Sequence, residues 1–322
     1  MSGLTKKISR MGLGCWAIGG GPAWGGDKDE QQCIDAIQAC PEYGITLIDT
    51  APGYNFGQSE RIVGKALKGM DREAVTVVTK FGLVWTRTGT PFNKVGDVQL
   101  YRNVSRESIM EEVDASLERL GVDYIDVYMS HWQAAAPFLT PISETMDALN
   151  ELKAQGKIKG IGAANVTVEQ IEEYLKYGEL DVVQAKYSVL DRGVEDELLP
   201  LCREKGIILQ AYSPLEQGML SGKLPRDYVP KGAQCNKKWF QPENMPKAMD
   251  FMDELRGGLC QKYGCSVADL AMAWVLAQDE NVMILSGTTS KDHLKANTNA
   301  MRLQLTPEDV ATMRAMAEAL EK

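Results

Sequence analysis

The sequence predicts an α/β protein that folds as a closed (β/α)8 TIM barrel, with an extra C-terminal helix and long loops at the C-terminal face of the barrel. Three observations lead to this prediction. Eight short β-rich runs occur along the 322 residues, each is followed by a stretch with helical periodicity, and no linker or change of composition divides the chain. We therefore expect one barrel domain over residues 1–322 rather than two doubly wound halves.

The strands and helices are expected to alternate along the whole chain. The strands lie at 8–14, 45–49, 75–80, 124–130, 158–164, 181–188, 207–213 and 282–288. The helices that follow them lie at 28–42, 58–68, 106–120, 141–155, 167–177, 193–205, within 246–278 and at 290–300. A last helix, opened by the capping sequence Thr306-Pro307-Glu308, is expected to run to about residue 320 and to pack outside the ring.

Two long insertions interrupt the repeat, one at 82–104 and one at 215–245. Both leave the C-terminal ends of strands, where barrel enzymes place their substrate-binding loops. The first insertion holds Trp85 and Tyr101, and the second holds Trp239 and Phe240. We expect both insertions to wall the pocket.

The composition excludes several classes of function. The formal net charge of -9 disfavours nucleic acid and anionic membranes as partners, and no apolar run approaches the roughly 20 residues that span a bilayer. Seven cysteines form no CxxC pair and the first residues show no signal-peptide pattern, so we expect reduced thiols in a cytoplasmic protein. With only His131 and His293 available, no metal site is expected.

A Rossmann domain at the N-terminus is the main alternative fold, because residues 12–17 spell GxGxxA. That motif requires a helix that opens immediately after the glycines. Here the run GGGPAWGG follows and would break such a helix. We therefore interpret the segment as a first barrel strand that enters a flexible glycine loop, on which Trp24 is expected to face a ligand.

Three of the expected strands end on ionisable residues, namely Asp49, Lys80 and His131, and Tyr54 lies just past the first. The carboxyl ends of parallel strands meet at one edge, so these side chains are expected to gather at one catalytic mouth. Lys80, paired with Asp49, can stabilise the phenolate of Tyr54 and so lower its pKa, and His131 can donate a hydrogen bond to a substrate oxygen. This set predicts proton delivery to a carbonyl group.

Each of these residues alone has a structural explanation, as a cap, a packing residue or an edge charge. Four residues of complementary chemistry at three strand ends are harder to explain in that way. No G-x-S-x-G elbow occurs, and no cysteine has a histidine near it in the sequence, so covalent hydrolysis has little support.

These residues resemble the catalytic signature of the aldo-keto reductase family, and the similarity extends over nearly the whole chain. Within the family the sequence looks closest to the bacterial branch that reduces sugar-like or polyol-derived carbonyls. The segments that carry the resemblance are IDTAPGY at 48–54, GQSE at 57–60, Thr79-Lys80 and Ser130-His131-Trp132.

The resemblance implies reversible hydride transfer between NAD(P)H and the carbonyl of an aldehyde, ketone or sugar. Tyr54 would donate the proton, Lys80 and Asp49 would tune it, and His131 would orient the substrate, which would also contact Trp24, Trp85 and Trp132. The residues that match cofactor-binding positions, or that we place beside the cofactor, are Cys15, Trp16, Asp49, Asn165, Gln184, Tyr212, Ser213, Pro214, Leu215, Gln217, Gly218, Lys223, Gly287, Thr289, His293 and Asn297.

The resemblance leaves the cofactor as NADP or NAD, with NADPH slightly favoured. NADP-preferring relatives often carry lysine or arginine for the 2′-phosphate at the positions of Gly287, Thr289 and His293. A cofactor-binding sensor or regulatory subunit with vestigial turnover is the alternative function, although relatives of that type tend to alter the position of His131. A barrel isomerase or aldolase with a Schiff base on Lys80 is a third possibility. The oligomeric state stays open.

Overall fold

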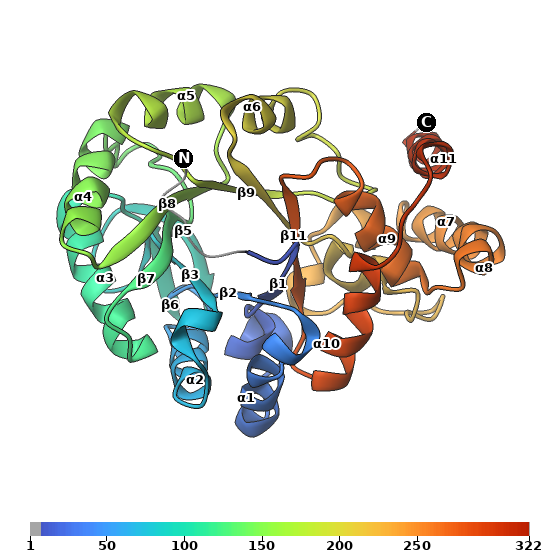
Figure 1. The fold of residues 1–322 in the computed structure, drawn as a ribbon, viewed down its shortest axis with the longest axis horizontal. Helices are drawn as coiled ribbons and strands as arrows, with labels where there is room; N and C mark the ends of the chain where they lie inside the picture. The colour runs from blue at the N-terminus through green and yellow to red at the C-terminus, as the bar shows by residue number, and fades with distance from the viewer. Residues whose placement is uncertain (1–7, 322) are drawn as a thin grey trace.

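The computed structural model describes residues 8–321, and eight parallel strands in it close into a barrel (Figure 1). The segment 1–7, which contributed to the expectation of no signal peptide, lies outside the described residues. The order around the barrel is β1-β11-β10-β9-β8-β7-β3-β2. The strands are β1 (Met11–Gly14), β2 (Leu47–Asp49), β3 (Thr76–Phe81), β7 (Ile125–Ser130), β8 (Ile158–Ala164), β9 (Val182–Lys186), β10 (Ile208–Tyr212) and β11 (Val282–Gly287).

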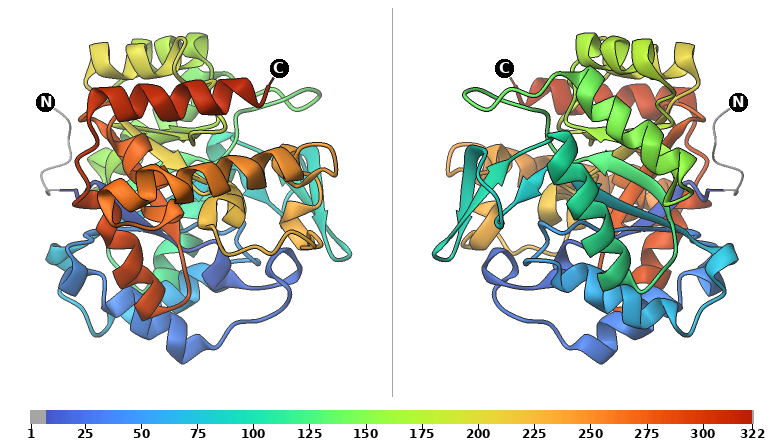
Figure 2. Two further views of the ribbon diagram at one scale, coloured as in Figure 1. Left: turned by 90° about the vertical axis from the view of Figure 1, so that its right-hand side faces the viewer. Right: turned by 90° about the vertical axis from the view of Figure 1, so that its left-hand side faces the viewer.

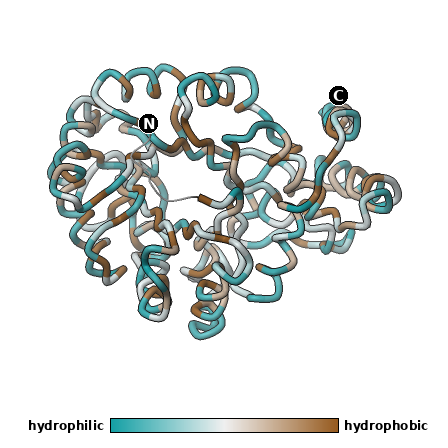
Figure 3. The backbone as a smooth tube through the Cα atoms, in the orientation of Figure 1, coloured by the Kyte–Doolittle hydropathy of each residue, from teal (hydrophilic) through white to brown (hydrophobic). Residues whose placement is uncertain are grey.

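All eight predicted strands occur at the predicted places, and helices surround the ring they form (Figure 1). In Figure 3 the strands around the centre are largely brown and the surrounding helices alternate between teal and brown, as expected for strands that are covered on their outer side by amphipathic helices. The helices are α1 (Glu30–Gln38), α2 (Gln58–Leu67), α3 (Arg106–Leu120), α4 (Ile142–Ala154), α5 (Val168–Tyr177), α6 (Leu198–Lys205), α7 (Met245–Gly257), α8 (Leu259–Tyr263), α9 (Val267–Leu276), α10 (Lys291–Asn297) and α11 (Pro307–Ala319).

Side-chain caps explain where several helices begin. The Ser105 side chain accepts a hydrogen bond from Ser108 N at the start of α3, and Thr167 forms a capping box with Gln170 at the start of α5. The long region 246–278, within which helical structure was expected, divides into α7, α8 and α9. The breaks fall at Gly258 and at Gly264, whose φ of 62° is left-handed and favours glycine.

The first insertion is a small antiparallel sheet rather than a loop. It contains β4 (Leu83–Val84), β5 (Thr90–Val95) and β6 (Val98–Arg102), in the order β4-β6-β5. Figure 2 shows this sheet beside the barrel, on the same side as the connection between β10 and α7. The Thr90 hydroxyl donates to Ala135 O at 2.5 Å and accepts from Phe138 N at 3.0 Å, so the sheet is anchored to the loop after β7.

The second insertion is built from 3-10 turns: η5 (Glu216–Ser221), η6 (Gly232–Gln234) and η7 (Lys238–Phe240). This insertion was expected to wall the pocket, but its aromatic residues Trp239 and Phe240 are 2% and 3% exposed and pack in the hydrophobic core. Trp239 Nε1 donates to Leu190 O at 3.2 Å, which satisfies its only polar atom.

The segment after β1 also forms 3-10 turns, η1 (Ala17–Gly19) and η2 (Pro22–Trp24), and no helix opens after its GxGxxA motif. Gly232 of η6 lies against η2, because a Cβ atom there would stand 2.6 Å from Ala23 O. The loops after β1 and β10 therefore meet at the mouth of the barrel.

Candidate active site

Asp49 and Lys80 form a buried ion pair at the ends of the neighbouring strands β2 and β3. Lys80 Nζ lies 2.8 Å from both carboxylate oxygens of Asp49, and it also donates to Thr50 O at 2.9 Å. Asp49 is 2% exposed and Lys80 0%. Charges buried this deeply require partners, and here Asp49 and Lys80 are partners of each other.

Tyr54 is the third member of the cluster. Its hydroxyl oxygen also accepts a hydrogen bond from Lys80 Nζ, at 3.3 Å. The turn that carries Tyr54 is held tightly, because a Cβ atom on Gly19 would lie 2.9 Å from Tyr54 O. Since the phenol oxygen accepts from Lys80, its own proton is free to be donated into the cavity that Tyr54 lines.

The environment of Tyr54 raises its pKa well above the usual value of 10.0, first because the phenol is desolvated and then because Asp49 is negatively charged. This corrects the expectation that Lys80 lowers this pKa. Asp49 neutralises much of the ammonium charge, so burial outweighs the attraction of Lys80 for a phenolate. Tyr54 therefore keeps its proton at neutral pH, as a proton donor must.

His131 follows β7 directly, and its ring centroid lies 5.6 Å from that of Tyr54. Burial, and secondarily the charge of Lys80, hold the pKa of His131 well below 6.5, so the imidazole is neutral at physiological pH. Its Nδ1 is buried and has no partner within residues 8–321. Because His131 lines the cavity, Nε2 is the nitrogen left to meet a ligand.

One cavity of about 700 Å³ covers this cluster and extends from η2 and the insertion sheet to α10. Its size falls within the roughly 300–1,000 Å³ of small-molecule and cofactor sites. It collects residues from almost every strand end of the barrel. The predicted site residues that line it are Trp16, Trp24, Asp49, Tyr54, His131, Trp132, Asn165, Gln184, Tyr212, Ser213, Pro214, Leu215, Gln217, Gly218, Lys223, Gly287, His293 and Asn297.

The part of the cavity between β1, β11 and the loop after β10 offers groups of the kind that a dinucleotide requires. Gly14 and Gly287 pair in register at the ends of β1 and β11 and leave the backbone accessible there. The loop after β10 bends around the cavity with positive φ at Gln217 and Gly218. Lys223 also lines this part of the cavity and forms no ion pair within residues 8–321, so its charge is available for a diphosphate.

Three residues expected at the nicotinamide are connected by hydrogen bonds. Tyr212 donates its hydroxyl proton to Asn165 Oδ1 at 2.8 Å, and Asn165 Nδ2 donates to His131 O at 2.9 Å. Gln184 Nε2 donates to Asp49 Oδ2 at 2.8 Å. The residues expected to bind the cofactor are thereby joined to the residues expected to carry the chemistry.

The structure does not bring four of the predicted site residues to the cavity wall. Lys80 lies behind Tyr54 and Asp49, where it can act on the phenol without contacting a ligand. Cys15 is fully buried, and its backbone N donates a hydrogen bond to Asp49 O. Thr289 lies one residue beyond the cavity wall, which Thr288 forms in its place. The ring of Trp85 packs on Phe56, with 5.3 Å between centroids, and does not line the cavity.

The insertion sheet contributes cavity residues that were not predicted from the sequence: Leu83, Phe92, Asn93, Val95 and Leu100. Tyr101, which was expected to wall the pocket, is not among them, because it lies next to Leu100 on β6 and points to the opposite face of the sheet. The Gly96-Asp97 turn between β5 and β6 was the available signal, since two residues of this type between short strands indicate a hairpin.

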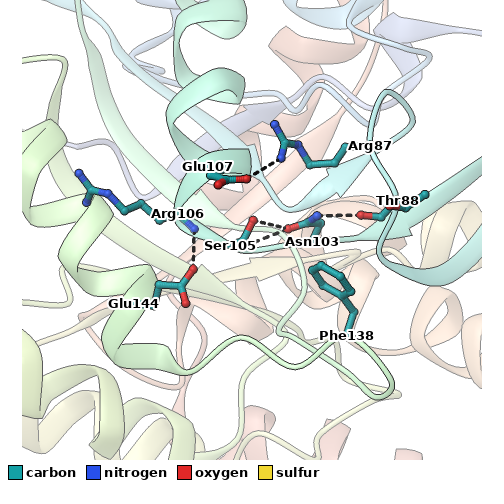
Figure 4. A pocket seen from close by; sticks show the side chains of 8 residues that line it. All are labelled: Arg87, Thr88, Asn103, Ser105, Arg106, Glu107, Phe138 and Glu144. Carbon is teal, nitrogen blue, oxygen red and sulfur yellow. Dashed lines mark hydrogen bonds and ion pairs between the residues drawn. The ribbon is translucent and has the colours of Figure 1, made fainter.

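A second cavity, of about 440 Å³, lies at the start of α3 (Figure 4). Its polar groups bind one another: Arg87 pairs with Glu107, Asn103 donates to Thr88 O, and Arg106 N donates to Glu144. The cavity therefore offers few unpaired groups to a ligand. Within residues 8–321, no group of three His, Cys, Asp or Glu side chains is placed to hold a metal ion.

The sequence profile of the aldo/keto reductase family matches residues 10–318, and the chain belongs to this family. Among curated relatives, the NADH-specific methylglyoxal reductase of Escherichia coli (strain K12) is 60% identical over 98% of this chain and 96% of its own length. The aldo-keto reductase YhdN of Bacillus subtilis (strain 168) is 37% identical over 97% of this chain and 91% of its own.

Solved structures agree with this assignment. The glycerol dehydrogenase of Gluconobacter oxydans superposes with a TM-score of 0.88 at 33% identity, covering 98% of this chain and 94% of that one. An aldo-keto reductase of Klebsiella pneumoniae in complex with NADPH superposes with a TM-score of 0.74 at 26% identity, covering 98% of this chain and 93% of that one.

The protein is accordingly an NAD(P)H-dependent oxidoreductase that transfers a hydride between the cofactor and the carbonyl group of a small molecule. The comparisons favour this function over that of a cofactor-binding sensor. Across residues 8–321, none of the helices has the length and apolar character needed to cross a membrane.

Proposed function

We propose that the protein reduces small 2-oxoaldehydes of the methylglyoxal type with NADH, using Tyr54 as the proton donor. The observation that carries this proposal is the chain from Asp49 through Lys80 to Tyr54, which opens into the cavity beside His131. The relative at 60% identity acts on methylglyoxal, which supports the substrate class.

Each residue of this cluster has a separate task. The nicotinamide, when bound, supplies the hydride. His131 donates a hydrogen bond from its neutral ring to the substrate oxygen and so aligns the carbonyl. Tyr54 donates its proton to the same oxygen as negative charge develops there, while Lys80, held by Asp49, stabilises the phenolate left behind.

The substrate end of the cavity is lined by aromatic rings, which suits an uncharged carbonyl compound. Trp16 packs edge-on against Trp24 with 5.1 Å between ring centroids, and Phe92 lies 5.4 Å from Trp132. All four residues line the cavity. We propose that these rings form the apolar wall around the substrate.

NADH is the cofactor we propose, which revises the slight preference for NADPH expected from the sequence. Within the described residues, the wall built by β11 and α10 contributes no lysine or arginine to the cavity. Lys291 is instead paired with Glu42 at 2.9 Å and lies over the ring of Tyr43. A 2′-phosphate would find no cation at this end, whereas a hydroxyl needs none.

The function is tested by measuring kcat/KM for a panel of carbonyl compounds with NADH and with NADPH. Methylglyoxal with NADH is expected to be the most efficient pair, on the order of tenfold better than with NADPH, because an unpaired phosphate forfeits a charge-assisted hydrogen bond. Neutral monoaldehydes and free sugars serve as comparison substrates. Equal or better rates with NADPH, or a preference for sugars, would contradict the proposal.

Placing a guanidinium at the α10 end is expected to relax the cofactor preference. In His293→Arg, kcat/KM with NADPH should rise by roughly tenfold, because arginine can bind the 2′-phosphate through two hydrogen bonds, while kcat/KM with NADH changes little. His293→Gln is the matched control, since it changes the same cavity residue without adding a charge. No gain with NADPH in the arginine variant would show that the phosphate lies elsewhere.

We propose that the protein works in the cytoplasm. All seven cysteines are free, and five of them are buried, as expected for a protein that needs no disulfides.

A further inference from the structure

Two glutamine side chains lie next to each other inside the barrel, below the nicotinamide end of the cavity. Gln184 of β9 and Gln210 of β10 are paired in register. Gln210 is 0% exposed and does not line the cavity. The interior of such a barrel is normally filled by branched apolar residues, so a buried amide at this position needs an explanation.

Hydrogen bonds determine which way both amides are turned. Asp49 Oδ2 accepts a hydrogen bond from Gln184 Nε2 at 2.8 Å, and a carboxylate that is paired with Lys80 can only accept. The nitrogen of Gln184 must therefore face Asp49. The same nitrogen donates to Gln210 Oε1 at 2.9 Å, so Gln210 must present its oxygen. The ion pair thus fixes the orientation of the Gln184 amide and, through it, the orientation of the Gln210 amide.

This arrangement leaves Gln210 Nε2 buried without a partner among the described residues. An unpaired buried amide nitrogen destabilises the fold, and leucine or methionine at this position would avoid that cost. Turning Gln210 around would not help, because its nitrogen would then face the nitrogen of Gln184. The chain keeps an unfavourable group here, which indicates a task other than stability.

The atom that benefits is Gln184 Oε1. It accepts no hydrogen bond within residues 8–321, it is not among the sealed polar atoms, and its side chain lines the cavity. We propose that Gln210 is a positioning residue for the cofactor: with Asp49, it locks the amide of Gln184 so that the carbonyl oxygen faces the cavity and accepts from the amide nitrogen of the nicotinamide carboxamide. This inference rests on the cofactor site proposed above.

The test compares two cofactors that differ only at that group, NADH and the reduced 3-acetylpyridine analogue, whose acetyl group has no N–H. Gln210→Met removes the acceptor and keeps the volume. Its dissociation constant for NADH, measured by fluorescence titration, is expected to rise about fivefold, the loss of one hydrogen bond of ~1 kcal/mol. The dissociation constant of the same variant for the analogue should stay within about twofold of the wild-type value. Met283→Leu, at the position paired with Gln210 on β11, is the packing control.

A double-mutant cycle with Gln184→Leu tests whether Gln210 affects NADH binding through Gln184. Once Gln184 is absent, Gln210→Met should not weaken NADH binding further, and the melting temperature of Gln210→Met should not fall. If Gln210→Met binds both cofactors equally more weakly and also has a lower melting temperature, Gln210 has a merely structural role and the proposal is overturned. Unchanged affinity of this variant for NADH would also overturn it. The proposed substrate and cofactor preferences are tested separately, by the kinetics of the wild-type protein, so their failure can be told apart from failure of the role proposed for Gln210.

Discussion

Replacing Tyr54 by phenylalanine is expected to lower kcat for carbonyl reduction by roughly 10²- to 10⁴-fold, the range for loss of a general acid. Tyr54 holds the only phenolic proton of the Asp49 and Lys80 cluster, and that proton is free for the substrate because Lys80 donates to the phenol oxygen. The burial that raises the pKa of Tyr54 keeps it protonated in the wild type. Steady-state kinetics with a saturating cofactor measures the effect.

Cofactor binding by this variant should be almost unchanged in a fluorescence titration, because phenylalanine retains the ring. Tyr101→Phe is the matched control, since Tyr101 belongs to the neighbouring insertion sheet and does not line the cavity. Turnover within about twofold of wild type in Tyr54→Phe would refute the assigned proton donor.

Replacing Lys80 by methionine is expected to destabilise the fold by about 3–5 kcal/mol, because it leaves a buried carboxylate without its cation. Among the partners in residues 8–321, the Asp49 carboxylate would keep only Gln184, and Thr50 O would lose a donor. Activity should also fall, since no cation would remain beside Tyr54. Urea denaturation gives the loss of stability, and kcat measured well below the midpoint gives the loss of activity.

Two comparison variants separate the ion pair from general damage. Lys65→Met removes an ion pair with Glu30 in which the side chains are 52% and 42% exposed, and it should cost no more than about 1 kcal/mol. The double variant Asp49→Asn/Lys80→Met removes both charges and should regain part of the stability without regaining activity. A Lys80→Met protein as stable as Lys65→Met would show that Asp49 finds another partner.

The buried amides extend the role of Asp49 beyond proton transfer. Its carboxylate holds Lys80 on one side and orients Gln184 on the other. The residues that act on the substrate and those that receive the nicotinamide therefore share one charge, so a change at Asp49 should affect both kinetics and cofactor binding.

The barrel and its catalytic edge could be predicted because they depend on local patterns. Strand periodicity, helix caps and glycine breaks act within a few residues, so the eight strands occurred where they were expected. Parallel strands place their carboxyl ends together, and this rule brought Asp49, Lys80 and His131 to one cluster. The same rule brought the loops after β1, β10 and β11, which leave the carboxyl ends of their strands, around one cavity.

The remaining features depend on side chains that meet across distant parts of the chain. The face of the insertion sheet toward the cavity follows its strand pairing, which brought Phe92 to the cavity. The ring of Trp85, beyond the end of β4, packs on Phe56 instead. The direction of the pKa shift of Tyr54 depends on total burial, which no single neighbour reveals. The bond between Gln184 and Asp49 joins residues 135 positions apart. Local sequence thus determined the elements and their catalytic edge, whereas burial and long-range contacts, which exist only in the folded chain, decided how the side chains act.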